Sequence, residues 1–170
     1  FFVALKLPNF FRSITAEGAF SISFVPLYTD KKIHVGQGAA SDFTNMALSF
    51  MVAVLLPLSI VMMWFMPFVV AVTAPGFSDD PYKFGLAVEM SRLSFPYMLL
   101  VTVAAILGAV LNAHNRFGPY AFAPVLFNVC LIVSVVFTPL FQTQGHEMAA
   151  FMSISGALQA IWVWMYLRKT

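Results

Sequence analysis

Long apolar runs separated by short polar stretches dominate the chain. Between Asp42 and Asp79 the sequence contains no charged residue at all. Apolar runs of this kind are long enough to cross the roughly 30 Å hydrocarbon core of a bilayer as helices. Pro57 and Pro67 are expected to kink the first of them. The pattern predicts four spanning helices, over residues 43–73, 86–112, 118–141 and 148–167.

The opening stretch, residues 1–28, has the length of a further spanning helix but carries ionisable groups. On a helical wheel Lys6, Asn9, Arg12 and Glu17 gather on one side. A basic side chain that faces lipid at the bilayer centre costs about 2.5–3.5 kcal/mol. This polar face is therefore expected to meet either protein or a water-filled cavity.

Two interpretations of this face are open on the residues alone. Arg12 and Glu17 could pair with each other or with neighbouring helices and simply hold a bundle together. Their spacing of five residues is poor for a pair within one helix, which needs three or four. Alternatively, Arg12 could supply a cationic site for an anionic substrate, because a guanidinium stays charged and binds phosphate with two parallel hydrogen bonds.

Composition strengthens the membrane interpretation. The chain has 170 residues, of which 61% are hydrophobic and 9% charged, whereas soluble domains carry about 25% charged residues. We therefore predict an all-α integral membrane protein, a partial bundle of about five spans when residues 1–28 are included. The net charge of +2 comes from scattered basic residues, a distribution that does not favour nucleic-acid binding.

Little in the sequence suggests bond-making chemistry. Cys130 is the only cysteine, so it cannot form an intrachain disulfide, and we expect it to be a small buried apolar side chain. No nucleophile–base pair, glycine-rich phosphate loop or paired carboxylates stand out. We expect no enzyme activity, no metal and no cofactor. The three histidines are far apart: His34, His114 and His146.

Several other polar residues are expected to have structural roles. Glu89 and Arg92 are spaced for an exposed pair on one helix. Asn128 lies inside an apolar run and is predicted to hydrogen-bond to a neighbouring helix. Asn115 and Arg116, with Asn112 before them, are expected to end a helix and anchor it at the membrane surface.

The basic residues predict the orientation. Lys31 and Lys32 fall in a predicted loop, residues 28–42, which shares its side of the membrane with Arg116 and the basic C-terminal tail. This side holds more Lys and Arg than the other and is expected to be cytoplasmic. The Phe1 end then lies toward the periplasm and the Thr170 end toward the cytoplasm. The first residues read as the middle of a longer protein.

Two blocks carry a family resemblance: "LKLPNFFRSITAEGAFSISFVP" and "GAVLNAHNRFGPYAFAPV". With the segments between them, they closely resemble the MurJ/MviN family of lipid II flippases of the bacterial inner membrane. The resemblance implies a bundle of 14 helices in two lobes, of which this chain would be helices two to six. It also implies that the whole protein moves the undecaprenyl-diphosphate-linked peptidoglycan precursor outward, by alternating access, for cell wall synthesis.

The resemblance further implies roles for single residues. Arg12 matches a functional arginine of a cationic cavity that receives the diphosphate, and Lys6, Asn9 and Glu17 match positions on the same helix. Ser13 stands where some relatives have a second basic residue. The implied partners are lipid II, membrane lipids and the rest of the transporter chain. Two alternatives are an exporter of another lipid-linked saccharide or drug, and a membrane scaffold without transport.

Overall fold

The computed structural model describes residues 19–77, 79–141 and 143–169. All regular elements in these ranges are helical, which confirms the predicted all-α class. Four helical stretches are long and apolar enough to cross a membrane: Gln37–Trp64, Pro81–Ala113, Gly118–Phe137 and Gln144–Leu167. Of the further span predicted at residues 1–28, residues 1–18 lie outside the described part.

The helices follow one another with short connections. The order is α2 (Ala19–His34), α3 (Gln37–Trp64), α4 (Met66–Thr73), the 3-10 turn η1 (Pro75–Phe77), α5 (Pro81–Ser94), α6 (Pro96–Ala113), α7 (Gly118–Ala121), α8 (Ala123–Ser134), the 3-10 segment η2 (Val135–Leu140) and α9 (Gln144–Leu167).

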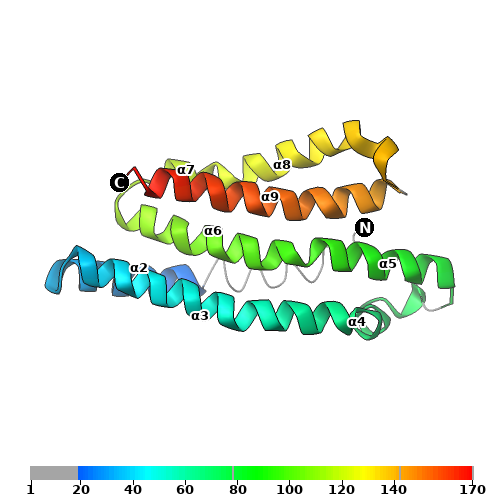
Figure 1. The fold of residues 1–170 in the computed structure, drawn as a ribbon, viewed down its shortest axis with the longest axis horizontal. Coiled ribbons are helices and arrows are strands. Elements are labelled where there is room, and N and C mark those ends of the chain that lie inside the picture. The colour runs from blue at the N-terminus through cyan, green and yellow to red at the C-terminus, as the bar shows by residue number, and fades with distance from the viewer. Residues whose placement is uncertain (1–18, 78, 142, 170) are drawn as a thin grey trace.

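Helix α6 is the centre of the arrangement. Figure 1 shows it between α3 on one side and α9 on the other, with α2 beside α3 and α8 beside α9. In the span that contains α6, 72% of the most apolar stretch is buried, against 11% for α3. Small residues at Ala104, Ala105, Gly108 and Ala109 allow the neighbouring helices to approach closely.

Prolines mark the interruptions within the spans. Helix α3 ends at Trp64 and α4 begins at Met66, next to Pro67, as the proline there predicts. Pro96 similarly separates α5 from α6. Pro57, by contrast, lies inside α3, which continues as a helix on both sides of it.

The prediction of a loop over residues 28–42 is wrong. Helix α2 continues to His34, and α3 already begins at Gln37 after a turn at Gly36, whose φ of 111° is a left-handed conformation that suits glycine. The charged residues in this stretch lie on an exposed helical surface, where Asp30 and His34 pair at 2.9 Å. Hydropathy marks the edge of the apolar run, and the helix extends beyond that edge.

Two other helices begin earlier than their apolar runs. The carboxylate of Asp80 accepts hydrogen bonds from the backbone N–H groups of Tyr82 and Lys83, at 3.1 and 3.2 Å, and so caps α5. The side-chain hydrogen bond from Lys83 lowers the pKa of Asp80. The hydroxyl of Thr143 caps α9 in the same way. Because of these polar caps, the two helices begin before residues 86 and 148, which are the beginnings that the apolar pattern predicts.

The predicted structural roles have mixed outcomes. Cys130 is buried, as expected. Asn115 adopts a left-handed φ of 58° just after α6 ends, which confirms the predicted helix stop. Asn128 is exposed on α8 and has no hydrogen-bond partner among the described residues, so its predicted bond to a neighbouring helix stays a prediction. Glu89 and Arg92 have partners on other helices instead of each other.

Candidate functional site

The four residues predicted to line a substrate cavity lie outside the described part of the chain. They are Lys6, Asn9, Arg12 and Glu17, all in the opening stretch before residue 19. Their arrangement therefore stays a prediction. The described residues contain a different polar site, at the end of the bundle where α2 ends and α3 begins.

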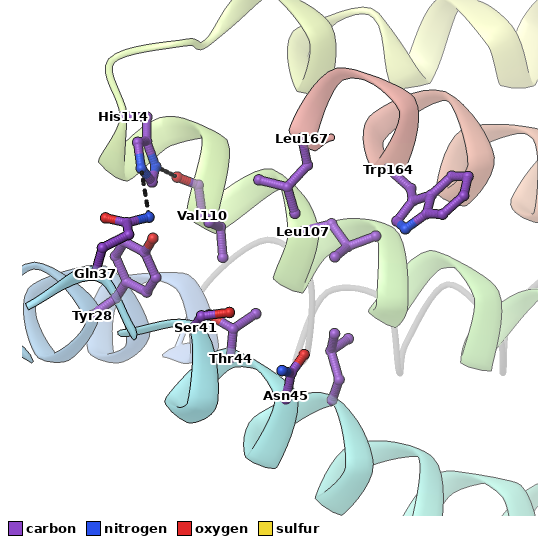
Figure 2. A pocket seen from close by; sticks show the side chains of 11 residues that line it. Tyr28, Gln37, Ser41, Thr44, Asn45, Leu107, Val110, His114, Trp164 and Leu167 are labelled. Carbon is purple, nitrogen blue, oxygen red and sulfur yellow. Dashed lines mark hydrogen bonds between the residues drawn. The ribbon is translucent and has the colours of Figure 1, made fainter. Parts of the chain in front are cut away.

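This site is a cavity of about 300 Å³ between α2, α3, α6 and α9. Figure 2 shows polar side chains from α2 and α3 on one side of it, and apolar and aromatic side chains from α6 and α9 on the other. Its lining residues are Tyr28, Gln37, Ser41, Thr44, Asn45, Leu48, Leu107, Val110, His114, Trp164 and Leu167.

Helix α3 supplies a polar stripe to the cavity. Gln37, Ser41 and Asn45 follow one another at intervals of four residues, which places them on one face of the helix. Thr44 also lines the cavity, but its hydroxyl donates to the carbonyl of Ala40 at 3.0 Å. Thr44 is thus already satisfied within the helix, whereas the amides and the Ser41 hydroxyl can serve a ligand or water.

His114 closes the end of the cavity. Its Nδ1 lies 2.9 Å from the carbonyl oxygen of Val110, and its Nε2 lies 3.5 Å from Nε2 of Gln37. Because a carbonyl can only accept, Nδ1 donates to Val110, and Nε2 then accepts from the Gln37 amide. Figure 2 shows both interactions as dashed lines.

Tyr28 brings α2 into the same network. Its side chain is buried, with a relative exposure of 1%. The Tyr28 ring packs against the His114 ring, with 5.7 Å between the centroids, and Phe24 one turn earlier stacks on Phe43 of α3 at 5.3 Å. These contacts hold the last turns of α2 against α3 and α6, so the cavity has a rigid wall.

Cations surround this end of the bundle and lie on aromatic rings. Arg168 sits over the ring of Trp164 at 4.5 Å, and Lys31 over Phe43 at 5.5 Å. Such cation–π pairs are favourable, and Trp with Arg or Lys is typical of the membrane–water boundary. The cavity thus combines neutral hydrogen-bonding groups with a basic rim, an arrangement suited to holding polar groups and not to making bonds.

Comparison with known proteins identifies the family. The family described as "Lipid II flippase MurJ" matches residues 1–170, the entire chain. The chain belongs to the MurJ lipid II flippase family. It is accordingly a multi-pass membrane protein of a transporter family, and the resemblance found in the two sequence blocks is confirmed.

Individual relatives agree with this assignment. The "Lipid II flippase MurJ" of Burkholderia cenocepacia is 35% identical over 160 residues, which cover 94% of this chain and 31% of the relative. Proteins named "Probable lipid II flippase MurJ" from Rickettsia prowazekii and Rhizobium meliloti are 32% and 35% identical, over 98% and 99% of this chain. The chain spans about a third of the length of these MurJ relatives.

Sequence reasoning missed the cavity, although part of its signal is visible. The spacing of Gln37, Ser41 and Asn45 marks a polar face at the beginning of α3. The predicted loop over residues 28–42 hid this face, because a loop has no fixed helical periodicity. The contact between Tyr28 and His114 joins positions far apart in the sequence, and no local pattern predicts it.

Proposed function

We propose that the full-length protein is a flippase that moves lipid II across the bacterial inner membrane for cell wall synthesis. The observation that carries this proposal is the family match over residues 1–170, together with relatives that bear the flippase name. The helical bundle is compatible with transport, since it offers several apolar spans and a cavity with polar lining at one end. Alternating access would require the remainder of the chain as the opposing half.

Arg12 is the residue that we assign to the substrate. A diphosphate carries several acceptor oxygens, and a guanidinium can bind two of them at once without losing its charge. Lys6, Asn9 and Glu17 are assigned to the same cavity on the strength of their shared helical face. The cavity that Tyr28 lines would contribute neutral contacts at most.

The orientation belongs to the same proposal. Lys31 and Lys32 lie in the last turn of α2, and Arg168 and Lys169 follow the last turn of α9. The C-terminal ends of α2, α6 and α9 lie at the same end of the bundle (Figure 1), which also holds the cavity. The positive-inside rule places this end in the cytoplasm. The polar cavity would then open toward the side on which lipid II is made.

Complementation tests the function and the role of Arg12. The full-length gene should restore growth to a bacterium depleted of its own flippase. Arg12→Ala should abolish this rescue, because the variant cannot bind the diphosphate, and Arg12→Lys should restore only part of it. Lys32→Ala is the matched control, since it removes a basic residue of the last turn of α2 that is not assigned to the substrate site, and it should rescue fully.

Two results would contradict the proposal in different ways. Full rescue by Arg12→Ala at normal membrane levels would remove Arg12 from the substrate site. Failure of the unaltered gene to rescue, despite normal insertion, would indicate another lipid-linked substrate.

A further inference from the structure

At the opposite end of the bundle, Arg92 of α5 bridges to the proline break in the neighbouring span. Pro67 has no N–H, so it cannot donate to the carbonyl of Met63 four residues before it. The Nε of Arg92 donates to this carbonyl instead, at 3.0 Å. This bond fixes the plane of the guanidinium, and its two terminal nitrogens have no hydrogen-bond partner among the described residues.

Glu89, one turn before Arg92, is held in a similar way. Its Oε2 lies 2.9 Å from Nε2 of His146 on α9, and the Nδ1 of that imidazole lies 2.9 Å from the Thr143 hydroxyl. The Glu89 side chain nevertheless remains 56% exposed. Its second oxygen, Oε1, has no partner among the residues that the structure describes, so a fixed carboxylate stands next to a fixed guanidinium.

The depth of this pair follows from the charge pattern. Residues 93–115 contain no charged side chain, and 23 helical residues are about 34 Å long. This length matches the roughly 30 Å hydrocarbon core, so Arg92 lies at the headgroup level of one leaflet. Trp64, which is 79% exposed beside Arg92, fits the same level, where tryptophan is enriched.

Two open hollows adjoin Arg92. One, of about 360 Å³, is lined by Glu89, Arg92, Leu93 and His146. The other, of about 510 Å³, is lined by Ile60, Met63, Trp64 and Arg92, and is apolar apart from the guanidinium. The first hollow offers one positive and one negative group at headgroup depth, while the second offers an apolar surface directly beside them.

We propose that these two hollows form a binding site for a phospholipid with a phosphoethanolamine headgroup. The phosphate accepts hydrogen bonds from the terminal nitrogens of Arg92, and the primary ammonium donates to Oε1 of Glu89. An acyl chain lies over Ile60, Met63 and Trp64. A choline headgroup has no N–H to donate to Glu89, and a glycerol headgroup has no positive charge, so both bind less well.

Lipid binding to the purified full-length protein tests this site. The probes are phosphatidylethanolamine, phosphatidylcholine and phosphatidylglycerol with identical acyl chains, and native mass spectrometry counts the lipids that stay bound. Loss of one charge-assisted hydrogen bond corresponds to about a tenfold weaker affinity. We therefore expect the ethanolamine lipid to bind about tenfold better than the other two.

Variants separate the two headgroup contacts. Glu89→Gln should remove the preference for ethanolamine over choline, because it removes the negative charge. Arg92→Gln should weaken all three lipids, because all carry the phosphate. Lys83→Gln is the matched control: it removes a cation of the same helix, paired with Asp80 at 3.0 Å, and should change nothing.

Further variants and a competition experiment separate the loss of a lipid contact from a change in the fold. His146→Gln keeps the carboxylate of Glu89 and should keep the ethanolamine preference. Trp64→Ala leaves the bond between Arg92 and Met63 in place but removes a wall of the apolar hollow, so it should weaken all three lipids. Free O-phosphoethanolamine, which has no acyl chain, should not displace the bound lipid at equal concentration.

Equal binding of the three lipids to the unaltered protein would overturn the site. So would an ethanolamine preference that survives Glu89→Gln. Displacement by free O-phosphoethanolamine would assign the pocket to a soluble ligand instead of a lipid.

Discussion

Single glycines determine how closely the helices approach α6. A Cβ atom at Gly108 would overlap the ring of Tyr120, and one at Gly156 would lie 2.9 Å from the Tyr97 ring and 3.0 Å from Cβ of Leu100. The backbone at both positions is ordinary helix, so it would accept any residue. Larger residues are excluded there only by the lack of space. The close approach of α7 and α9 to α6 therefore depends on the absence of a side chain at Gly108 and Gly156.

The Gly108 contact leads to a stability prediction. Gly108→Ala should force the Tyr120 ring to move and should lower the free energy of unfolding by about 1–3 kcal/mol. Gly85→Ala is the matched control, since Gly85 is also helical but has nothing within 4 Å of an added Cβ. It should leave stability unchanged or raise it by up to about 1 kcal/mol. Thermal unfolding of the full-length protein in detergent measures both, and equal midpoints would contradict the packing account.

Helices are joined in this bundle by polar side chains that reach the carbonyls at helix ends and breaks. Ser153 of α9 donates to the carbonyl of Leu93 at 2.6 Å, and the indole of Trp162 donates to the carbonyl of Pro119 in α7 at 3.0 Å. Arg92 does the same at Met63. A carbonyl without an intrahelical donor is costly to leave unpaired in an apolar environment, and Pro67 leaves the Met63 carbonyl in that state. The bonds to Leu93 and Pro119 join two elements without such a break.

Two neighbouring tryptophans test this tethering. Trp162→Phe keeps an aromatic ring beside Phe122 but loses the hydrogen bond to Pro119. The free energy of local opening of α7 should therefore fall by about 1 kcal/mol. Amide hydrogen exchange over residues 117–122 should become about fivefold faster. Trp164→Phe is the control, because the Trp164 indole has no acceptor among the described residues; an equal acceleration there would argue against the tether.

At the scale of the whole molecule, the sequence predicts the four apolar helices that the structure describes, because apolar length and proline positions are local properties. The break at Pro67 and the helix stop at Asn115 are read from neighbouring residues alone. Contacts between distant residues are not local, and sequence reasoning did not find the pairs of Tyr28 with His114 or Glu89 with His146. The substrate site predicted from the sequence also depends on residues 1–18, which the described structure does not include.

The central claim, that the whole protein moves lipid II with Arg12 on its diphosphate, has one direct test. Purified full-length protein is reconstituted into vesicles that contain lipid II, and the fraction of lipid II that reaches the opposite leaflet is followed over time. We predict translocation by the unaltered protein, none above protein-free vesicles for Arg12→Ala, and a partial rate for Arg12→Lys. An Arg12→Ala variant that translocates as fast as the unaltered protein would contradict the claim.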